Sequence, residues 1–398
     1  MCKILILAVA LGELACAKPE PPPAAAAAPM RHHEIRADQL PAPFHTQSAG
    51  NPPNVVPRPT DARLTLPHGF RIEVWADGFA DPRNMILAPN GDVFIADSAA
   101  GRIVVVREGK RWVFADELNR PFGLAFRGDQ LYVGTSDAVV RFDYTPGQTL
   151  SSGAPTRVTP LPVGGHATRN LVFNRDASKM YVAVGSASNV DDETADPLRA
   201  AITEYNPDGS GKRPFASGLR NPIGLAWKGN ALWTVVNERD GLGDDLVPDF
   251  ATEVRDGAFY GWPFSYIGQR VDPRREGEHP ELVARAIPPS LLLEAHSAPI
   301  TIAFYDGTMF PERYRGGAFV ALHGSWNRTA RSGYKVVHVP FRGDEPAGGY
   351  DDFIIGWAPD PERDRVWGRP AGLLVLRDGS LLVSDDGAGV IWRVTHSR

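Results

Sequence analysis

The amino-acid sequence predicts an all-β protein, and more specifically a six-bladed β-propeller. Glycine and proline are frequent, with 40 and 36 residues in a chain of 398, which favours turns over long helices. Long amphipathic helical patterns are missing from the sequence, and a short hairpin pattern recurs six times. With 43% hydrophobic and 22% charged residues, the composition is that of a globular protein and excludes a disordered or collagen-like chain.

Each copy of the hairpin pattern contains a short apolar strand, a polar turn such as Asn90-Gly91, and a second strand rich in β-forming residues. Successive copies begin about 37 to 80 residues apart, which is near the spacing of propeller blades. Because a single blade cannot bury its own faces, we expect six blades to stack around a channel. Five clear copies start at Arg83, Arg120, Arg169, Arg220 and Arg369, and a divergent sixth starts near Ala298.

Residues 70–75 precede the first copy and read as one more strand. We expect this strand to join the last blade, which closes the ring and removes its exposed edges. The propeller is therefore predicted to form one domain, residues 67–398.

The beginning of the chain is set apart from this domain. Lys3, a short apolar run and a small-residue exit predict a secretory signal peptide at residues 1–17, and hence a periplasmic or secreted protein. Cleavage after residue 17 leaves no cysteine, whereas cleavage before Cys16 leaves one that could carry a lipid anchor. Glu13 stands where a bacterial lipoprotein signal normally has an aliphatic residue. Residues 18–66 are predicted to be a Pro/Ala-rich linker and N-terminal extension outside the fold.

The recurring arginines indicate an anionic ligand. In a hairpin blade, the start of the first strand and the end of the second share one face, so the arginines that open the copies converge on one rim. Arginine is suited to bidentate recognition of carboxylate or phosphate. Pairing of each arginine with a carboxylate of a neighbouring blade is the structural alternative. The net charge of −5, from 42 Lys+Arg and 47 Asp+Glu, gives no reason to expect a nucleic-acid partner.

Three further features lie on the same face. Loop 237–245 concentrates carboxylates, glycines and carbonyl groups and suits a hard cation such as Ca²⁺, although an Asx-turn loop with solvated acids has the same composition. His166 lies three residues before Arg169, where a general base is needed, although a lone histidine is more often structural. Trp326, in the run 323–328, could form an aromatic wall for a flat ligand or pack within a tight loop.

These features occur within five sequence phrases: residues 165–170 (GHATRN), 218–222 (GLRNP), 237–245 (NERDGLGDD), 259–263 (FYGWP) and 323–328 (HGSWNR). In combination they resemble the L-sorbosone dehydrogenase-like branch of the sugar dehydrogenases that depend on pyrroloquinoline quinone (PQQ). That branch is related to soluble glucose dehydrogenase and to fungal pyranose dehydrogenase. The resemblance extends from about residue 66 to the C-terminus.

The resemblance implies a cofactor, a metal and a base. PQQ is a flat quinone with three carboxylates, so an arginine rim and an aromatic wall are the implied cradle. His166 is the implied base that removes the substrate hydroxyl proton as hydride passes to the quinone. Backbone carbonyls of Asp240 and Gly241 are the implied ligands of a Ca²⁺ ion that polarises the quinone. The implied cofactor-binding residues are Arg83, Arg169, Arg220, Asn221, His323, Trp326, Asn327, Arg328 and Arg369.

One departure concerns the base. Loop 185–189 (GSASN) offers no carboxylate at its start to orient His166.

The resulting hypothesis is a PQQ- and Ca²⁺-dependent oxidoreductase that oxidises a sugar, either an aldose or a sorbosone-like aldehyde. Its implied electron acceptor is a cytochrome or the quinone pool. The first alternative is a Ca²⁺-dependent six-bladed hydrolase of the lactonase type, which needs mainly carboxylate and Asn ligands where this rim has Arg. A non-catalytic binding propeller is the second alternative, and it leaves His166 and the acidic loop without a role.

Overall fold

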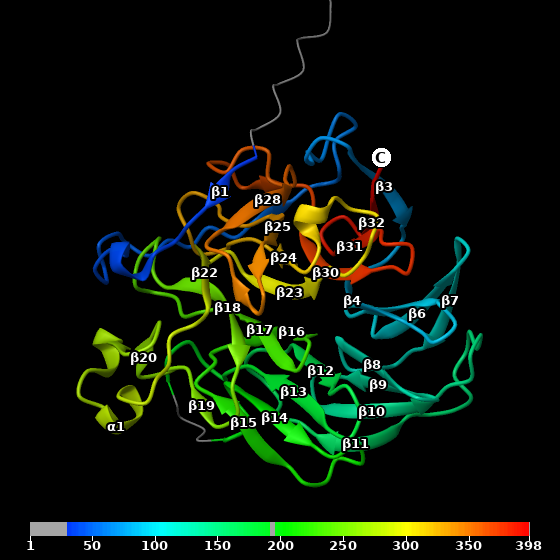
Figure 1. The fold of residues 1–398 in the computed structure, drawn as a ribbon, viewed down its shortest axis with the longest axis horizontal. Coiled ribbons are helices and arrows are strands. Elements are labelled where there is room, and N and C mark those ends of the chain that lie inside the picture. Colours follow the sequence, from blue (N-terminus) through cyan, green and yellow to red (C-terminus); the bar gives the residue numbers. More distant parts are fainter. Residues whose placement is uncertain (1–29, 192–195, 398) are drawn as a thin grey trace, which may run out of the picture.

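The computed structural model describes residues 30–191 and 196–397. These residues form six sheets of four or five strands, arranged as blades around a common axis, with almost no helix (Figure 1). The prediction of an all-β, six-bladed propeller is confirmed. The predicted signal peptide, with Cys16, lies outside the described residues. Within them, no helix is long and apolar enough to cross a membrane.

The strands of each blade pair antiparallel, and the first strands of neighbouring blades contact one another around the axis. Blade 1 contains β4 (Pro82–Leu87), β5 (Val93–Asp97), β6 (Arg102–Arg107) and β7 (Lys110–Ala115). Blade 2 contains β8 (Gly123–Arg127), β9 (Gln130–Gly134), β10 (Ala138–Asp143) and β11 (Thr156–Pro160). Blade 3 contains β12 (Arg169–Phe173), β13 (Met180–Val184), β14 (Ala201–Tyr205) and β15 (Arg213–Ser217). Blade 4 contains β16 (Pro222–Lys228), β17 (Ala231–Val236), β18 (Pro248–Val254) and β22 (Leu291–Ala295). Blade 5 contains β23 (Pro299–Phe304), β24 (Ala318–Leu322), β25 (Lys335–Val339) and β28 (Tyr350–Ile354). Blade 6 contains β30 (Pro370–Val375), β31 (Leu381–Asp385), β32 (Val390–His396) and β3 (Phe70–Ala76).

The remaining elements are short and lie in the connections. They are β1 (His32–His33), η1 (Ala37–Gln39), β2 (Asn54–Val55), β19 (Ala258–Phe259), β20 (Ser265–Tyr266), β21 (Arg270–Val271), η2 (Pro273–Arg275), α1 (Pro280–Val283), η3 (Glu312–Tyr314), β26 (Phe341–Arg342), β27 (Glu345–Pro346) and β29 (Arg365–Val366).

The ring closes between the two ends of the domain, as predicted. Strand β3, from the start of the propeller, pairs antiparallel with β32 at the C-terminus, from Phe70 opposite His396 to Ala76 opposite Ile391. Blade 6 therefore takes its fourth strand from the other end of the chain, so β32 is paired on both sides and β3 forms the outer edge of the blade.

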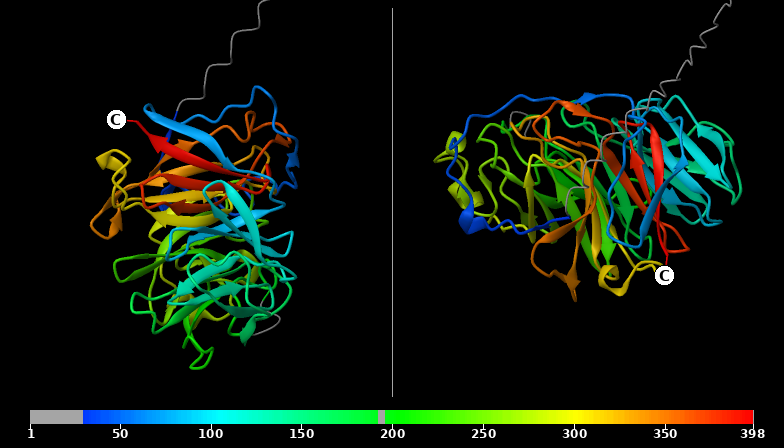
Figure 2. Two further views of the ribbon diagram at one scale, coloured as in Figure 1. Left: turned by 90° about the vertical axis from the view of Figure 1, so that its right-hand side faces the viewer. Right: turned by 90° about the horizontal axis from the view of Figure 1, so that it is seen from above.

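Residues 30–66, here called the N-terminal strap, lie on the outside of the propeller as an ordered segment (Figure 2). Strand β1 extends blade 5 by pairing with β28, and β2 pairs with β29. This differs from the expectation of a linker outside the fold. The Pro/Ala tract dominates the composition of residues 18–66. From residue 30 onward, however, short strands of this segment pair with strands of the propeller, and composition alone does not reveal such pairing.

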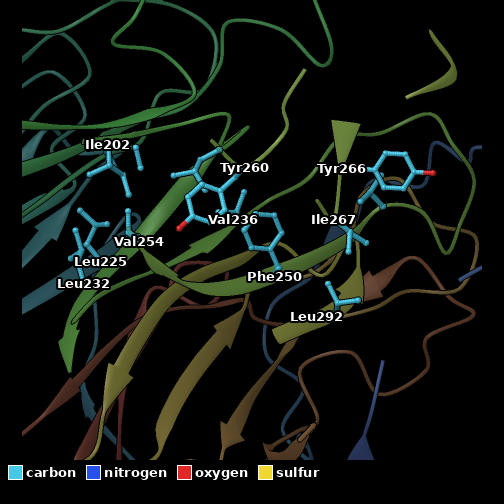
Figure 3. Close-up of a cluster of buried hydrophobic side chains, with 14 of the residues drawn as sticks. Ile202, Leu225, Leu232, Val236, Phe250, Val254, Tyr260, Tyr266, Ile267 and Leu292 are labelled. Carbon is cyan, nitrogen blue, oxygen red and sulfur yellow. The ribbon is translucent and has the colours of Figure 1, made fainter. Parts of the chain in front are cut away.

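The apolar core lies between the blades. Between blades 3 and 4, Ile202 of β14 and Leu225 of β16 pack with Val236 of β17 and Phe250 of β18 (Figure 3). All four are at least nine-tenths buried, and burial of each such side chain contributes roughly 1.5–3 kcal/mol. This rigid packing supports the loops at the ends of the blades.

Buried aspartates at the ends of second strands hold the loops that enter the same blades. Asp97 ends β5 and accepts hydrogen bonds from the backbone N–H groups of Ala80 and Asp81, at 3.0 and 2.7 Å. Asp385 ends β31 and accepts one from the backbone N–H of Arg369 at 2.7 Å. The loops that enter blades 1 and 6 are thus fixed next to Arg83 and Arg369, the arginines that open these two copies.

Candidate active site

Loops of blades 1, 3, 4, 5 and 6 enclose a cavity of about 340 Å³. Its volume lies within the usual range of small-molecule sites. The sequence-predicted residues that line it are Arg83, His166, Arg220, Asn221, Asp240, His323, Trp326, Asn327 and Arg369. Arg169, Arg328 and Gly241 were predicted to belong to the same site and are not among the lining residues.

His166 is held by backbone groups of the loop that follows β13. Its Nδ1 lies 2.9 Å from the carbonyl oxygen of Ser186, which can only accept, so Nδ1 carries the proton in the neutral ring. The free lone pair is then on Nε2. The Ser186 N–H donates to the carbonyl of Arg220 at 2.7 Å, so the same residue links the imidazole to the next blade. The backbone carbonyl of Ser186 therefore orients the His166 ring, although loop 185–189 contains no carboxylate that could do so.

Glycine permits the close contact between these two loops. Gly165 has a φ of +61°, and a Cβ there would lie 2.6 Å from the Ser186 carbonyl oxygen. Any larger residue before His166 would force the loops apart.

Arg169 does not line the cavity and instead forms hydrogen bonds to the loop that contains His166. The side chain is completely buried, and its guanidinium donates to the carbonyls of Pro162, His166 and Thr168. Burial lowers the pKa of Arg169 to about 10. Because carbonyls of its own entry loop take the guanidinium donors, the position of Arg169 at the start of a copy did not determine its role.

Arg220 forms an ion pair with Asp240, and Asn189 contacts both residues. The Arg220 Nη2 lies 3.1 Å from the Asp240 carboxylate and 3.0 Å from the Asn189 side-chain oxygen. Asn189 also accepts a hydrogen bond from the Asp240 N–H at 2.8 Å, and its backbone carbonyl accepts from Trp262 at 2.8 Å. One loop thus orients both the imidazole and an arginine.

Arg83 and His323 share Asp386. The Arg83 Nε lies 2.9 Å from both Asp81 and Asp386, and the His323 Nε2 lies 2.7 Å from Asp386. Burial, and then the charge of Arg369, lower the pKa of His323 to about 3, so its ring is neutral at ordinary pH. Arg83 therefore already has carboxylate partners, as the structural alternative proposed.

Arg369 and Asn221 retain unused hydrogen-bonding capacity. Arg369 donates to the carbonyls of His323 and Gly324 but forms no ion pair within residues 30–191 and 196–397. Burial lowers its pKa, so an incoming anion would be stabilised by this cation. The Asn221 side-chain oxygen is buried without a hydrogen-bond partner. Such unsatisfied groups on a cavity wall favour a polar ligand.

Arg328 points away from this cavity. Its guanidinium donates to Asp245 at 2.7 Å and to the carbonyls of Asp244 and Ala330 at 3.1 and 2.8 Å. Two of these acceptors belong to loop 237–245 and the third is the carbonyl of Ala330, and together they account for the difference from the predicted contact with the cofactor.

The implied metal ligands do not present a free cation site. The Asp240 carbonyl accepts hydrogen bonds from Asn189 at 2.9 Å and from Arg274 at 2.7 Å. The Asp240 carboxylate accepts from Arg220 and Asn327. The described part of the chain contains no group of three or more His, Cys, Asp or Glu residues arranged to hold a metal ion. As they stand, these residues do not fit a Ca²⁺ ion bound through the Asp240 carbonyl.

Sequence reasoning missed several residues of the cavity. The wall beside Asp240 contains His296, whose Nδ1 lies 3.1 Å from Asn327, and buried Asp249. Burial raises the pKa of Asp249 to about 7. Ile223 and Ile300 also line the cavity and pack with Phe122. All three apolar residues lie at or near the start of a first strand, a signal that the repeat pattern contained.

The fold and the cavity together define a β-propeller whose cavity is lined by arginines and by a neutral, oriented histidine. The chain belongs to the TrAA12-like family, whose model matches residues 64–248 and 272–397. An uncharacterized protein of Borreliella burgdorferi is 26% identical over 357 residues, covering 84% of this chain and 91% of that protein. A pyrroloquinoline quinone-dependent pyranose dehydrogenase of Coprinopsis cinerea is 23% identical over 407 residues, covering 83% of this chain. The match covers 54% of the Coprinopsis protein, so the chain spans about half its length.

Solved structures show the same fold. The PQQ domain of the Coprinopsis pyranose dehydrogenase in its holo form has a TM-score of 0.74 at 21% identity, covering 85% of this chain and 98% of that one. A family AA12 enzyme of Trichoderma reesei has a TM-score of 0.75 at 20% identity, with coverages of 86% and 100%. The PQQ-bound aldose sugar dehydrogenase of Streptomyces coelicolor has a TM-score of 0.60 at 19% identity, with coverages of 84% and 100%. The family model and these relatives confirm the resemblance to the PQQ-dependent sugar dehydrogenases, whereas the sorbosone dehydrogenase-like branch stays a prediction.

The environment of His166 leads to a testable prediction. Burial, and then the positive charge of Arg220, lower the pKa of His166 from 6.5 to about 4. We expect NMR titration of the ligand-free protein to show an imidazole that stays neutral at pH 5 and protonates near pH 4. The His166→Ala spectrum identifies the signal. A midpoint at 6.5 would contradict the buried, hydrogen-bonded ring.

Proposed function

We propose that this protein is a PQQ-dependent sugar dehydrogenase that uses His166 as its general base. The observation that carries the proposal is the placement of Arg369, a buried cation without a carboxylate partner in the described residues, in the same cavity as the oriented imidazole of His166. Membership of the TrAA12-like family and the PQQ-dependent relatives support it.

The residues present fit a flat, polyanionic cofactor. Arg220 and Arg369 approach the cavity from blades 4 and 6, and the Asn221 side chain lies on the same wall, next to Arg220 in sequence. Trp326 is 52% exposed and offers an aromatic surface. Charged hydrogen bonds to carboxylates and contact with a ring face are the interactions that a tricarboxylate quinone requires.

The chemistry assigned to the protein is proton removal and orientation. PQQ, when bound, accepts the hydride that leaves the sugar carbon. The Nε2 lone pair of His166 accepts the hydroxyl proton, because Nδ1 is already committed to the Ser186 carbonyl. Since the pKa of His166 is lowered to about 4, the base is in its active neutral form above that pH and is lost as the pH falls through it. Arg220 and Arg369 would hold the carboxylates of PQQ in place while the sugar loses its hydride and its hydroxyl proton.

The resemblance also suggests the substrate, the electron acceptor and the location of the enzyme. The substrate is an aldose or a sorbosone-like aldehyde, and the electrons pass to a cytochrome or to the quinone pool. Export through the signal peptide at residues 1–17 would place the enzyme in the periplasm or outside the cell. The mass of the mature N-terminus distinguishes cleavage after residue 17 from lipid attachment at Cys16.

Arginine substitutions test the cofactor site. Arg220→Ala and Arg369→Ala should each weaken PQQ binding roughly 10- to 100-fold, because a hydrogen bond to a charged group contributes about 1.5–3 kcal/mol. Arg120→Ala is the matched control, since Arg120 opens another copy of the pattern but is exposed and does not line the cavity. Titration of PQQ into the three variants measures the effect. Equal affinities would mean that the arginine rim is structural.

Replacement of His166 tests the base. His166→Ala should lower turnover by roughly 10²- to 10⁴-fold, the usual contribution of a positioned base, while PQQ still binds. Reduction of a dye acceptor with aldoses measures turnover at saturating PQQ. Normal turnover of the alanine variant would refute the assignment of the base, even if the cofactor is correct.

Calcium dependence stays a prediction from the resemblance, and the Asp240 carbonyl makes it testable. If Ca²⁺ binds at Asp240 and Gly241, PQQ affinity should be higher in CaCl₂ than in a chelator. Arg274→Ala should increase this difference, because it removes one of the two hydrogen bonds to the Asp240 carbonyl. Equal affinity in CaCl₂, MgCl₂ and chelator, for both the parent and the variant, would exclude a role for Ca²⁺ in cofactor binding.

A further inference from the structure

His323 lines the same cavity as His166, but its ring is held by a carboxylate. It directly follows β24 in blade 5 and is 7% exposed. Its Nε2 lies 2.9 and 2.7 Å from the two carboxylate oxygens of Asp386, which directly follows β31 in blade 6. An ionised carboxylate can only accept hydrogen bonds, so Nε2 carries the proton of the neutral ring. The lone pair of the His323 ring is therefore on Nδ1.

The surroundings fix this arrangement. Burial alone would raise the pKa of Asp386, but the charge of Arg83 and the contact with His323 outweigh it and hold that pKa below its usual range. The backbone N–H of His323 donates to the carbonyl of Ala298 at 3.0 Å, which holds the ring in place. Within residues 30–191 and 196–397, Nδ1 has no hydrogen-bond partner, and the atom is not completely buried.

The charges beside the His323 ring cancel one another. Arg369 donates to the carbonyls of His323 and Gly324 at 3.2 and 3.1 Å. Arg83 lies 2.9 Å from both Asp81 and Asp386. Two guanidinium groups thus stand against two carboxylates. A further carboxylate at this corner of the cavity would leave one negative charge in excess, which buried surroundings disfavour.

The other titratable groups near this corner do not contact the ring. Tyr334 is neutral, because burial raises its pKa. Asp385 accepts hydrogen bonds from two tryptophan indoles and is turned away from the cavity corner. Asp249 accepts the N–H of Ala298, so a peptide group separates it from His323. Among the described residues around this corner, the Nδ1 atom of His323 is therefore the atom placed to gain a proton.

We propose that His323 donates a hydrogen bond from Nδ1 to a carboxylate of PQQ, and that its imidazole takes up one proton from solution when the cofactor binds. Both ring nitrogens then donate, Nε2 to Asp386 and Nδ1 to the ligand, and only the doubly protonated imidazolium can do this. Its positive charge offsets the carboxylate that enters. The inference rests on the proposed function, because it takes PQQ as the ligand.

The proposal fixes the direction of the pH dependence. Burial, and then the charge of Arg369, lower the pKa of His323 in the ligand-free protein to about 3, so the ring is neutral before binding. A bound carboxylate raises that pKa. Between the free and the bound pKa, PQQ affinity should fall as the pH rises, by up to roughly tenfold per pH unit, because one proton is bound with the ligand.

Isothermal titration calorimetry with PQQ counts the protons. Binding enthalpies measured at about pH 6 in MES and in Bis-Tris, two buffers of different ionisation enthalpy, should show about one proton more taken up by the parent than by His323→Gln. Comparing the two proteins cancels protons gained or lost by PQQ itself or by Asp249. His166→Ala removes the other neutral histidine of this cavity wall and is the matched control, which should keep the uptake of the parent.

Asp386→Asn tests why the proton is needed. An amide can donate to Nε2, so the neutral ring can move its proton to Nδ1 and still donate to the ligand. PQQ should then bind with the low proton uptake of His323→Gln, and its affinity should lose the dependence on pH. If Asp386→Asn fails to fold because Arg83 loses a partner, His323→Gln leaves that ion pair intact and decides the matter alone.

The outcomes separate this inference from the proposed function. Equal proton uptake by the parent and by His323→Gln overturns the inference, although PQQ binding still supports the proposed function. Uptake that is lost in His166→Ala and kept in His323→Gln assigns the proton to the other histidine and also overturns it. If PQQ does not bind the parent at any pH, the proposed function fails and the inference fails with it.

Discussion

The pairing of β3 with β32 is the constraint on which the rest of the molecule depends. The six blades bury their faces only against one another, so a ring without this closure would expose the outer part of blade 6 and its boundary with blade 1. The site spans that boundary, because Arg83 of blade 1 pairs with Asp386, which follows the second strand of blade 6. The distance between these groups is set by closure of the whole ring and by no local sequence feature.

Within the closed ring, backbone carbonyls control the chemistry of the cavity. Ser186 fixes the proton of His166 on Nδ1, and Asn189 of the same loop orients Arg220 and Asp240. The imidazole of His166 and the guanidinium of Arg220 thus share one supporting segment, and the positive charge of Arg220 helps to keep the imidazole neutral. A carboxylate partner for His166 would act in the opposite direction by favouring its charged form. The arrangement yields an imidazole that stays neutral in mildly acidic surroundings.

Asp240 illustrates how a loop sequence can indicate oxygen ligands without showing which donors those oxygens meet. The acidic loop indicated oxygen ligands, and the structure does direct the oxygens of Asp240 toward cationic and amide donors. Those donors are Arg220, Arg274, Asn327 and Asn189. Carbonyl availability cannot be read from a loop sequence, because it depends on which side chains of other loops reach it.

The sequence by itself determined the fold class, the six copies, the closing strand and the face on which functional residues gather, since each follows from local hairpin patterns and their spacing. It also brought His166, Arg220, Arg369 and Trp326 to one cavity. Only the tertiary structure decided that Arg169 turns into its own loop, that Arg328 pairs with Asp245, and that the strap packs beside Trp326. The physical reason is that a side chain satisfies its charge and hydrogen bonds with the nearest acceptor in space, and for these residues that acceptor lies on a loop or blade that no repeat pattern specifies.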